Sequence, residues 1–511
     1  MLTGQNGILT NAAKAKENTE AASDLEFLQT KAYEAVTNYY VKGQTGSENE
    51  YILEELGKVS GVETSVSQGT VKYKGKTYDI SEIIGNTSEQ KAIEKEEGLK
   101  QVTVATATDA EDKAILSSKD SDGNAKVRMI IVEENTDNTT VKAVIPSGFY
   151  YVTGKPSTGL VISDKFDDDD NNSKGGNQFV WVPCNGGKAK YKAHTYATAN
   201  VDDLGGSTAD TGNGGWKTYY YRNYSDWQDN AGEATVTSAK ANSVATYGGF
   251  YVARYEAGVP SNAPFYANTN GAKYETSSKK NTDQYIPVSK KNNQSWNYIS
   301  QANAKTVSAN MYKNSTVVTS QLVDSYAWDT VVQWMVKNES YKGIGLDSSN
   351  YGNYYNNDKI DLSNALYAAH RYGSRKNTSV NDYWTIATKY IKGPIKSGAE
   401  AVTASTGPSK YEFAASTYDD TNYNYTIRKE LATGSAKETK INNIYDMAGN
   451  MWEWTTETGN PDGTSTTRAV RRGGGFNSYG SDYPVSSRHG NYTVSDSCSI
   501  DIGFRVVLYI Q

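Results

Sequence analysis

Cysteine and histidine are the side chains best suited to act as nucleophiles or metal ligands, and this chain of 511 residues has few of either. Its two cysteines, Cys184 and Cys498, lie too far apart in the sequence to form a zinc motif by themselves. Its three histidines, His194, His370 and His489, leave little material for a multi-histidine metal centre. Neither residue type therefore indicates a metal site.

Four consecutive aspartates, Asp167–Asp170, form an acidic run that is a candidate calcium loop. The run lacks the glycine and the distal glutamate of an EF-hand. Acidic side chains at loop tips are usually solvated without a ligand, and we favour that interpretation over a metal site. We therefore predict no metal and no cofactor.

The composition indicates a folded protein with at least one large core, because 37% of the residues are hydrophobic. At about 150 residues per domain, the length predicts about three domains. The formal net charge of -6 argues against a nucleic-acid partner or an anionic membrane surface. No run approaches the roughly 18 apolar residues of a membrane-spanning helix. The chain has 40 tyrosines and 9 phenylalanines, and this excess of tyrosine needs an explanation.

The N-terminal elements predict a small α+β domain over residues 1–85. Apolar side chains recur at helical spacing over 18–40, and a short helix is expected over 50–56. Residues 70–74 and 77–80 alternate in the way of two strands, and the two residues Gly75-Lys76 between them predict a hairpin.

The amino-acid composition changes twice in the middle of the chain. Residues 86–140 are polar and charge-rich, so we expect a connector with one or two strands, at 102–107 and 126–132. From residue 141 onward, short apolar runs alternate with long loops rich in Tyr, Asn, Gly, Ser and Thr. Long aromatic loops of this kind favour a binding function over disorder.

Within residues 141–511 we predict strands at 149–152, 179–182, 250–254 and 504–510. Trp328, Val331, Val332 and Met335 share one face of a predicted helix, with Asp324 or Ser325 as its N-cap. A second helix is expected at 362–367.

Three motifs near the C-terminus are the most informative: 443–454, 471–476 and 502–508. Trp452 and Trp454 have strand spacing, which places both indoles on one face. The residues Gly473-Gly-Gly475 permit a close backbone turn. The last motif is too apolar for an exposed edge strand, so its lone charge, Arg505, needs a buried acidic partner, and Glu453 is our candidate.

These motifs, in this order and spacing, resemble the formylglycine-generating-enzyme (sulfatase-modifying factor) branch of the C-type lectin fold. Residues 179–183 and 248–256 are similar to the opening strand and the next block of that family. The resemblance covers about 141–511, with large insertions between 184 and 248 and between 258 and 322. It implies an α+β protein with a C-type lectin-like head that carries long loop insertions.

The opening residues, Met1–Lys16, resemble the segment just after the membrane helix in type IV pilin-like proteins of Gram-positive bacteria. In that family an apolar helix precedes this segment and continues as the helix expected at 18–40. The resemblance implies that residues 1–85 are a pilin-like stem whose apolar membrane helix is absent from this chain. We therefore expect an extracellular, cell-surface protein that associates with a pilus or membrane through the missing helix.

The catalytic residues of the lectin-fold family do not recur here. Its formylglycine-generating members use paired copper-binding cysteines shortly after the Gly-Gly-aromatic turn, where this chain has Ser478 and Tyr483. Cys498 stands alone, and one thiol cannot supply two thiolate ligands. The sulfoxide-synthase relatives need three histidines around iron, which this chain does not pair on a helix. We expect no catalytic residue and predict that the protein is not an enzyme.

Residues 476–501 contain no Lys, Glu, Gln, Met or Trp. A low-complexity loop also lacks these types, but the absence has a specific meaning in a third group of relatives, the variable proteins diversified by retroelements. In that family the adenines of a template are miscopied, and those five types cannot be reached from an AAC codon by changing its adenines. The resemblance implies a variable segment at 476–501, between unvaried flanks at 471–475 and 502–508.

We therefore expect an adhesin-like protein that binds an unidentified protein or glycan on another cell or a phage. An enzyme of the formylglycine-generating type with altered chemistry and a non-diversified pilus-tip lectin are the alternatives. Tyr, Ser, Gly and Asn, prominent in the segment, also suit antibody paratopes. The candidate ligand-binding residues are Phe476, Asn477, Ser478, Tyr479, Ser481, Asp482, Tyr483, His489, Asn491, Tyr492, Asp496, Cys498, Ser499, Ile500 and Asp501. We expect most of these side chains to share one accessible face, with Gly474, Trp452, Phe504 and Arg505 buried beneath it.

Overall fold

The fold is described from a computed structural model of the chain. The residues that the structure describes are 23–24, 27–32, 34–36, 38–39, 48–80, 83, 93, 95–102, 107–116, 118, 129–135, 139–166, 168–184, 238–261, 285–341, 343–345, 347–357, 359–361, 365–375, 381–385, 391–392, 423–459, 468–493 and 499–511. The pilin-like opening, Met1–Lys16, lies outside them. Among the described residues, no helix has the length and apolar character needed to cross a membrane.

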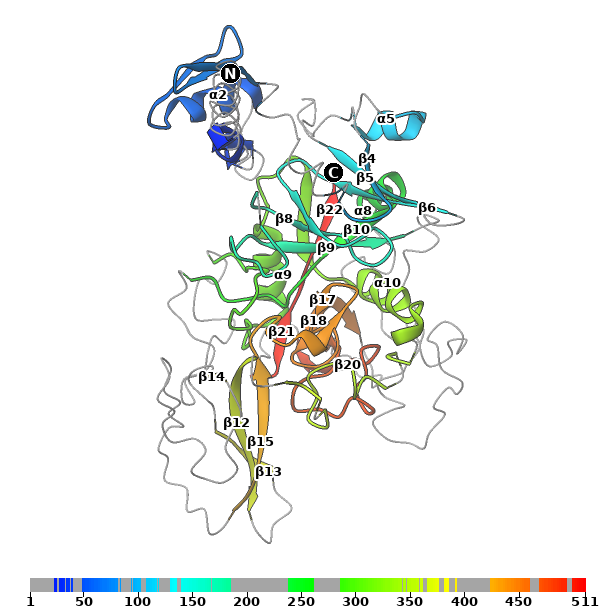
Figure 1. Ribbon diagram of the computed structural model, residues 1–511. Coiled ribbons are helices and arrows are strands. Elements are labelled where there is room, and N and C mark those ends of the chain that lie inside the picture. Colours follow the sequence, from blue (N-terminus) through cyan, green and yellow to red (C-terminus); the bar gives the residue numbers. More distant parts are fainter. Residues whose placement is uncertain are drawn as a thin grey trace, which may run out of the picture.

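The N-terminal unit is a helical segment beside a small sheet, and it lies at one end of the molecule (Figure 1, blue). Every described position between 23 and 39 is helical, and α2 (Glu48–Gly57) follows. Strands β1 (Val62–Ser65), β2 (Thr70–Tyr73) and β3 (Lys76–Asp79) form a three-stranded sheet.

The hairpin predicted from the sequence is present, with its turn one residue earlier than expected. Lys74 and Gly75 form the turn, and their φ values of 48° and 80° are the positive values that the commonest two-residue hairpin turns require. The strand β1 was not expected. It pairs antiparallel with β2 over four residue pairs and completes the sheet.

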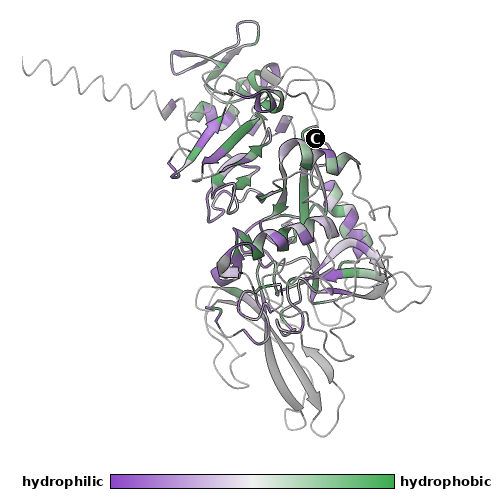
Figure 2. Cartoon of the chain, turned by 90° about the vertical axis from the view of Figure 1, so that its right-hand side faces the viewer, coloured by the Kyte–Doolittle hydropathy of each residue, from purple (hydrophilic) through white to green (hydrophobic). Residues whose placement is uncertain are grey.

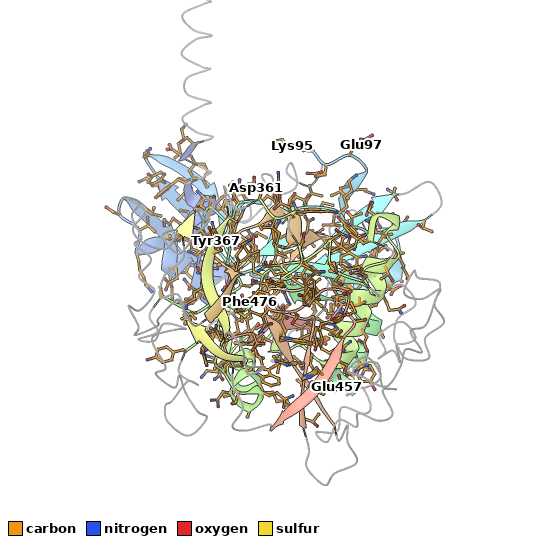
Figure 3. All side chains as sticks on the ribbon, turned by 90° about the horizontal axis from the view of Figure 1, so that it is seen from below. Lys95, Glu97, Asp361, Tyr367, Glu457 and Phe476 are labelled. Carbon is orange, nitrogen blue, oxygen red and sulfur yellow. The ribbon has the colours of Figure 1, made fainter. Side chains whose placement is uncertain are left out.

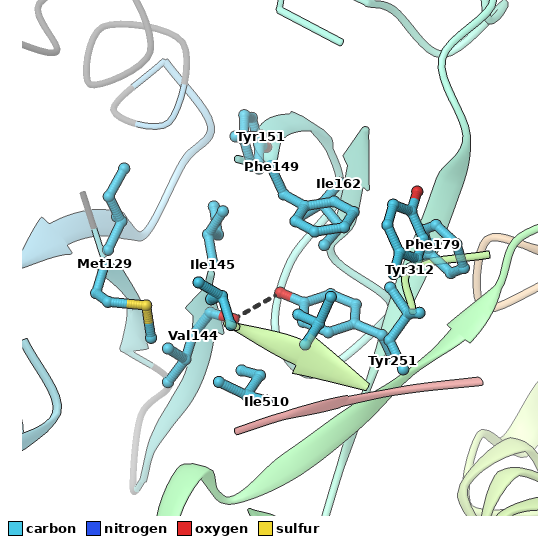
Figure 4. Packing of buried hydrophobic residues seen from close by; sticks show 14 of the residues in the cluster. Met129, Val144, Ile145, Phe149, Tyr151, Ile162, Phe179, Tyr251, Tyr312 and Ile510 are labelled. Carbon is cyan, nitrogen blue, oxygen red and sulfur yellow. Dashed lines mark hydrogen bonds between the residues drawn. The ribbon is translucent and has the colours of Figure 1, made fainter. Parts of the chain in front are cut away.

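A second three-stranded sheet occupies part of the range expected as a polar connector. It consists of β4 (Leu99–Val102), β5 (Ile130–Asn135) and β6 (Thr140–Ile145), with α5 (Ala110–Leu116) beside it. Strands were expected at 102–107 and 126–132; β4 ends within the first range and β5 begins within the second, whereas β6 was not expected. The hydroxyl of Tyr251 donates a hydrogen bond of 2.8 Å to the carbonyl oxygen of Val144, joining this sheet to the head (Figure 4).

The head is organised around a six-stranded sheet in the order β11-β22-β10-β9-β8-β7. Its strands are β7 (Tyr150–Thr153), β8 (Val161–Ser163), β9 (Gln178–Pro183), β10 (Gly249–Ala253), β11 (Val318–Leu322) and β22 (Val506–Ile510). Every residue of β10 and β22 is buried, so both faces of these strands are covered. Figure 2 shows the hydrophobic residues concentrated along these central strands.

Three helices flank the head sheet: α8 (Ser238–Tyr247), α9 (Gln301–Asn310) and α10 (Ser325–Val336). The predicted helix around Trp328 is α10, and Asp324 is its N-cap, because the carboxylate accepts a hydrogen bond of 2.7 Å from the backbone nitrogen of Ala327. The buried indole of Trp328 donates a hydrogen bond of 2.9 Å to the carbonyl oxygen of Val485.

A four-stranded sheet in the order β20-β19-β18-β21 carries the C-terminal motifs. Its strands are β18 (Trp452–Gly459), β19 (Arg468–Arg472), β20 (Arg488–Thr493) and β21 (Ile502–Phe504). Trp452 and Trp454 share one core cluster, as their spacing predicted. The strand expected at 504–510 is interrupted at Arg505, so that it contributes β21 to this sheet and β22 to the larger one.

A long two-stranded arm projects from the end of the head opposite the N-terminal unit (Figure 1). It is formed by β12 (Leu366–Arg375) and β15 (Tyr423–Leu431). On the other side of β12 lie β13 (Asn381–Thr385) and β14 (Ile391–Lys392). A separate short hairpin consists of β16 (Lys440–Ile441) and β17 (Ile444–Tyr445). The helix expected at 362–367 is wrong, because Leu366 and Tyr367 begin β12. A short apolar run of this kind is compatible with either a helix or a strand. Pairing with β15, which is far away in the sequence, makes it a strand.

Candidate ligand-binding face

The glycine turn at 473–475 brings the segment 476–501 against the head. Gly473 and Gly474 have φ values of +88° and +74°, a backbone conformation that favours glycine. A Cβ atom on Gly474 would lie 2.4 Å from the carbonyl oxygen of Tyr483 and 2.7 Å from the ring of Tyr354. The close turn expected from the sequence is therefore required by packing on both sides.

A buried ion pair joins the two head sheets below this turn. The Nη2 and Nε atoms of Arg505 donate hydrogen bonds of 2.7 and 3.1 Å to the Glu453 carboxylate, and both side chains are completely buried. The remaining guanidinium hydrogens reach the carbonyl oxygens of Ala253 and Tyr445. The predicted Arg505–Glu453 pair is confirmed, and the same guanidinium binds residues of β10, β17 and β18.

A second set of buried charges, which sequence reasoning missed, lies under the segment. Asp329 of α10 accepts hydrogen bonds from Arg472 of β19 and, at 2.8 Å, from Arg488 of β20. Glu457 of β18 pairs with the Nε atom of Arg488 at 2.7 Å. All four side chains are buried, and two positive charges balance two negative ones, which is the condition for keeping ions in a core. In the sequence, the only sign of these buried charges was that charged residues lie among the residues of strands.

The predicted binding residues divide into exposed and buried ones. Tyr479 and Asp482 are exposed, and Asn477, Ser481, Tyr483 and Ser499 are half-buried. Phe476, Ser478, His489, Ile500 and Asp501 are buried; Figure 3 shows Phe476 among packed side chains, whereas Lys95 and Glu97 point outward from the sheet edge. Asn491 and Tyr492 lie on β20, but their side chains are outside the described part, as are Asp496 and Cys498.

The expectation of one accessible face is therefore wrong for Ser478, His489 and Ile500. His489 shows the reason: β20 pairs with β19 here, so that the imidazole is held over Trp452 at a centroid distance of 5.5 Å. Its Nδ1 atom accepts a hydrogen bond of 3.1 Å from Arg471 Nε. Burial and the Arg471 charge lower the pKa of His489 to about 2, so the ring is neutral at physiological pH.

The residues expected beneath the face are buried as predicted. Trp452 is 2% exposed, and Phe504 and Arg505 are completely buried. Gly474 is buried as well. The flanks of the segment therefore supply core residues, while the exposed side chains among its described residues, Tyr479 and Asp482, lie in the turn 477–483.

Backbone contacts with a distant loop, residues 347–357, hold the turn 477–483. The backbone nitrogen of Ser348 donates to the carbonyl oxygen of Gly480 at 3.1 Å, and the nitrogen of Tyr355 donates to that of Ser478 at 2.9 Å. A Cβ atom on Gly480 would lie 2.3 Å from the backbone nitrogen of Ser349, so the two chains touch. The sequence predicted tyrosine-rich loops in this part of the chain but gave no sign that this loop and the turn are neighbours.

The aspartates at 168–170 form hydrogen bonds and ion pairs with other residues of the protein. The buried Asp168 accepts hydrogen bonds from Ser163 Oγ and Asn172 Nδ2, both at 2.8 Å, and Asp170 pairs with Arg254. Asp167 lies outside the described residues. Within the described ranges, His, Cys, Asp and Glu side chains do not gather in groups of three or more that would hold a metal ion.

Cys184 is the one cysteine that the structure describes, and it lies in the wall of a pocket of about 330 Å³ between the head and the β4–β6 sheet. Its side chain is buried, and burial raises the pKa of the thiol to about 12. The thiol is therefore protonated at neutral pH, in the state that is a poor nucleophile and a poor metal ligand.

Comparison with known proteins bears on the C-terminal part of the chain. Residues 370–510 match the family model described as a sulfatase-modifying factor enzyme 1-like domain. The match supports a C-type lectin-like fold of the formylglycine-generating-enzyme type for this part of a mixed α+β chain. It covers the turn 477–483 and three of the four buried charges, Glu457, Arg472 and Arg488, but not Asp329.

The other comparisons add little. A solved structure entitled "Crystal Structure of CarF" is similar at 11% identity and a TM-score of 0.24, covering 52% of this chain and 87% of that one. A TM-score that low supports no argument about a shared fold. No curated protein matches the sequence.

Proposed function

We propose that this protein is a cell-surface, adhesin-like binding protein whose segment 476–501 is diversified by a retroelement. The observation that carries the proposal is the way the turn 477–483 is held. Its described hydrogen bonds to the 347–357 loop use main-chain atoms of Ser478 and Gly480. The side chains of Tyr479 and Asp482 are exposed, and the Tyr479 ring meets the ring of Tyr355 edge to face.

This arrangement separates the shape of the turn from the identity of its side chains. Substitutions at exposed positions typically change the free energy of unfolding by under about 0.5 kcal/mol, whereas buried substitutions cost more through cavities and unpaired polar groups. A surface of this kind accepts many sequences on one backbone. Among the side chains that the structure describes, the proposal therefore assigns the variation to Asn477, Tyr479, Ser481–Tyr483 and Ser499, and excludes the buried stretch 484–489. The candidates Asn491, Tyr492, Asp496 and Cys498 stay within the proposed variable segment.

The remaining parts of the proposal follow the resemblances of the sequence. The helix-led N-terminal unit serves as a pilin-like stem, which supports an extracellular position and association with a pilus or membrane. The ligand is a protein or glycan on another cell or a phage. The buried thiol of Cys184, with its raised pKa, supports binding rather than catalysis.

The DNA beside the gene provides the test. We expect a near-copy of the 476–501 coding sequence close to a reverse transcriptase gene. Differences between the two copies should fall only where the near-copy has adenine, and only in codons of the segment outside 484–489. The codons of 484–489 serve as the internal control and should be identical. A locus without a second copy, or with differences at other nucleotides, contradicts the proposal.

A further inference from the structure

We propose that the 347–357 loop is a fixed half of the ligand-binding face, with Tyr355 and Asn356 as its contact residues, and that the face fits a saccharide. The inference rests on the proposed function for the position of the face. It adds two binding residues outside the variable segment, and it names the chemical class of the ligand.

The aromatic part of the face comes from both halves. The rings of Tyr355 and Tyr479 meet at a centroid distance of 5.4 Å and an interplanar angle of 86°. In such an edge-to-face pair, the ring that presents its edge keeps both of its own faces outside the contact. Tyr479 is 44% exposed, and Tyr355 is half-buried. The two rings therefore form a corner at the surface, with Tyr479 as its more exposed member.

The polar part surrounds this corner with neutral groups and one carboxylate. The Asn356 amide accepts a hydrogen bond of 3.2 Å from the backbone nitrogen of Gly480 and donates one of 3.1 Å to Ser349 Oγ. These bonds fix the orientation of the amide and leave it one N–H and one oxygen lone pair. Ser481 and Asp482 add a hydroxyl and a carboxylate beside Tyr479.

This combination matches a sugar ring better than it matches a protein surface. A pyranose has an apolar face of C–H groups, which stacks on an aromatic ring, and a rim of hydroxyls that both donate and accept. A stable protein interface takes about 800 Å² and 20–30 residues from each partner. The corner offers Tyr355, Asn356, Tyr479, Ser481 and Asp482, which is the size of a one- or two-sugar site.

The two halves have different consequences for specificity. Tyr355 and Asn356 lie far upstream of 476–501, so every diversified copy of the protein presents them unchanged. The varied side chains then alter which sugars or linkages fit, while the fixed ring and amide keep the ligand within one chemical class.

The experiment uses the full chain on an array of purified polysaccharides and oligosaccharides, followed by equilibrium titration with the strongest binder. We expect Tyr355→Ala and Tyr479→Ala each to weaken binding at least tenfold, because each removes one wall of the corner. Tyr355→Phe keeps the ring and should stay within about twofold of the unchanged protein. Ile286→Ala, at a residue that is also 44% exposed but lies outside the face, is the matched control and should bind normally.

A thermal melt of each variant shows whether loss of binding reflects loss of folding. If Tyr355→Ala unfolds, Asn356→Asp replaces it, since aspartate keeps the acceptor for Gly480 and loses the amide donor; binding should then fall at least threefold. Binding to no saccharide on the array overturns the ligand class. Full binding by folded Tyr355→Ala, together with loss in Tyr479→Ala, overturns the fixed half but leaves the proposed function intact. The proposed function is tested separately, by the DNA sequence beside the gene.

Discussion

The turn 477–483 and the stretch 484–489 are neighbours in one segment of similar composition, yet the structure treats them in opposite ways. The first is held by main-chain hydrogen bonds to the 347–357 loop and presents Tyr479 and Asp482 to solvent. The second is buried throughout, and its Arg488 and His489 take part in core contacts. Composition does not separate the two parts, and long-range pairing decides which residues of the segment are exposed.

The largest expected effect comes from the buried charges. Asp329→Ala should lower the free energy of unfolding by about 3–5 kcal/mol, because it leaves Arg472 and Arg488 facing Glu457 alone in the core. Urea denaturation followed by circular dichroism measures the change. Asp482→Ala, which removes an exposed carboxylate, is the matched control and should change stability by under about 0.5 kcal/mol. Equal effects of the two substitutions would remove the distinction between turn and buried stretch.

An intermediate effect is expected from the pH dependence of His489. The unfolded chain binds a proton at this imidazole below about pH 6.5, whereas the folded state stays neutral down to a pKa of about 2. The free energy of unfolding therefore falls as the pH falls, by about 1.4 kcal/mol per unit below 6.5 from this group alone. His489→Asn should lose that part of the slope between pH 6.5 and 5. If the free energy of unfolding changed with pH in the same way in His489→Asn and in the unchanged protein, the imidazole of His489 would be exposed to solvent in the folded state.

The smallest effect should come from the turn itself. Replacing Tyr479, Ser481 and Asp482 together by alanine should leave the melting temperature within a few degrees, since each exposed change is worth under about 0.5 kcal/mol. Differential scanning calorimetry gives the comparison with the unchanged protein. A loss of several kcal/mol would mean that these side chains hold the backbone, and the segment would then tolerate little variation.

Local patterns predicted the elements whose contacts are themselves local or strongly patterned. The Asp324 N-cap, the shared face of Trp452 and Trp454, and the Arg505–Glu453 pair follow from spacing and from the cost of a lone buried charge. Each needs only a short stretch of sequence, or one obvious partner.

The features that sequence reasoning missed depend on partners far away in the chain. Leu366 and Tyr367 became part of a strand because β15 pairs with them. Asp329 is unremarkable until α10 is placed over β19 and β20, which brings it to two arginines. Tyr355 likewise joins the candidate face only through its contact with Ser478 and Tyr479. No spacing rule reports such contacts.

The position of β22 has a consequence for how the protein is made. This strand follows every other strand of the head sheet in the sequence, yet it pairs on one side with β10 and on the other with β11. The head cannot complete its fold until the codons after 501 have been translated. Under the proposed function, a copying error that shifts the reading frame inside 476–501 would replace β21 and β22 with unrelated residues. Such a product would lack a central strand and go to proteolysis, so that only in-frame variants would reach the cell surface.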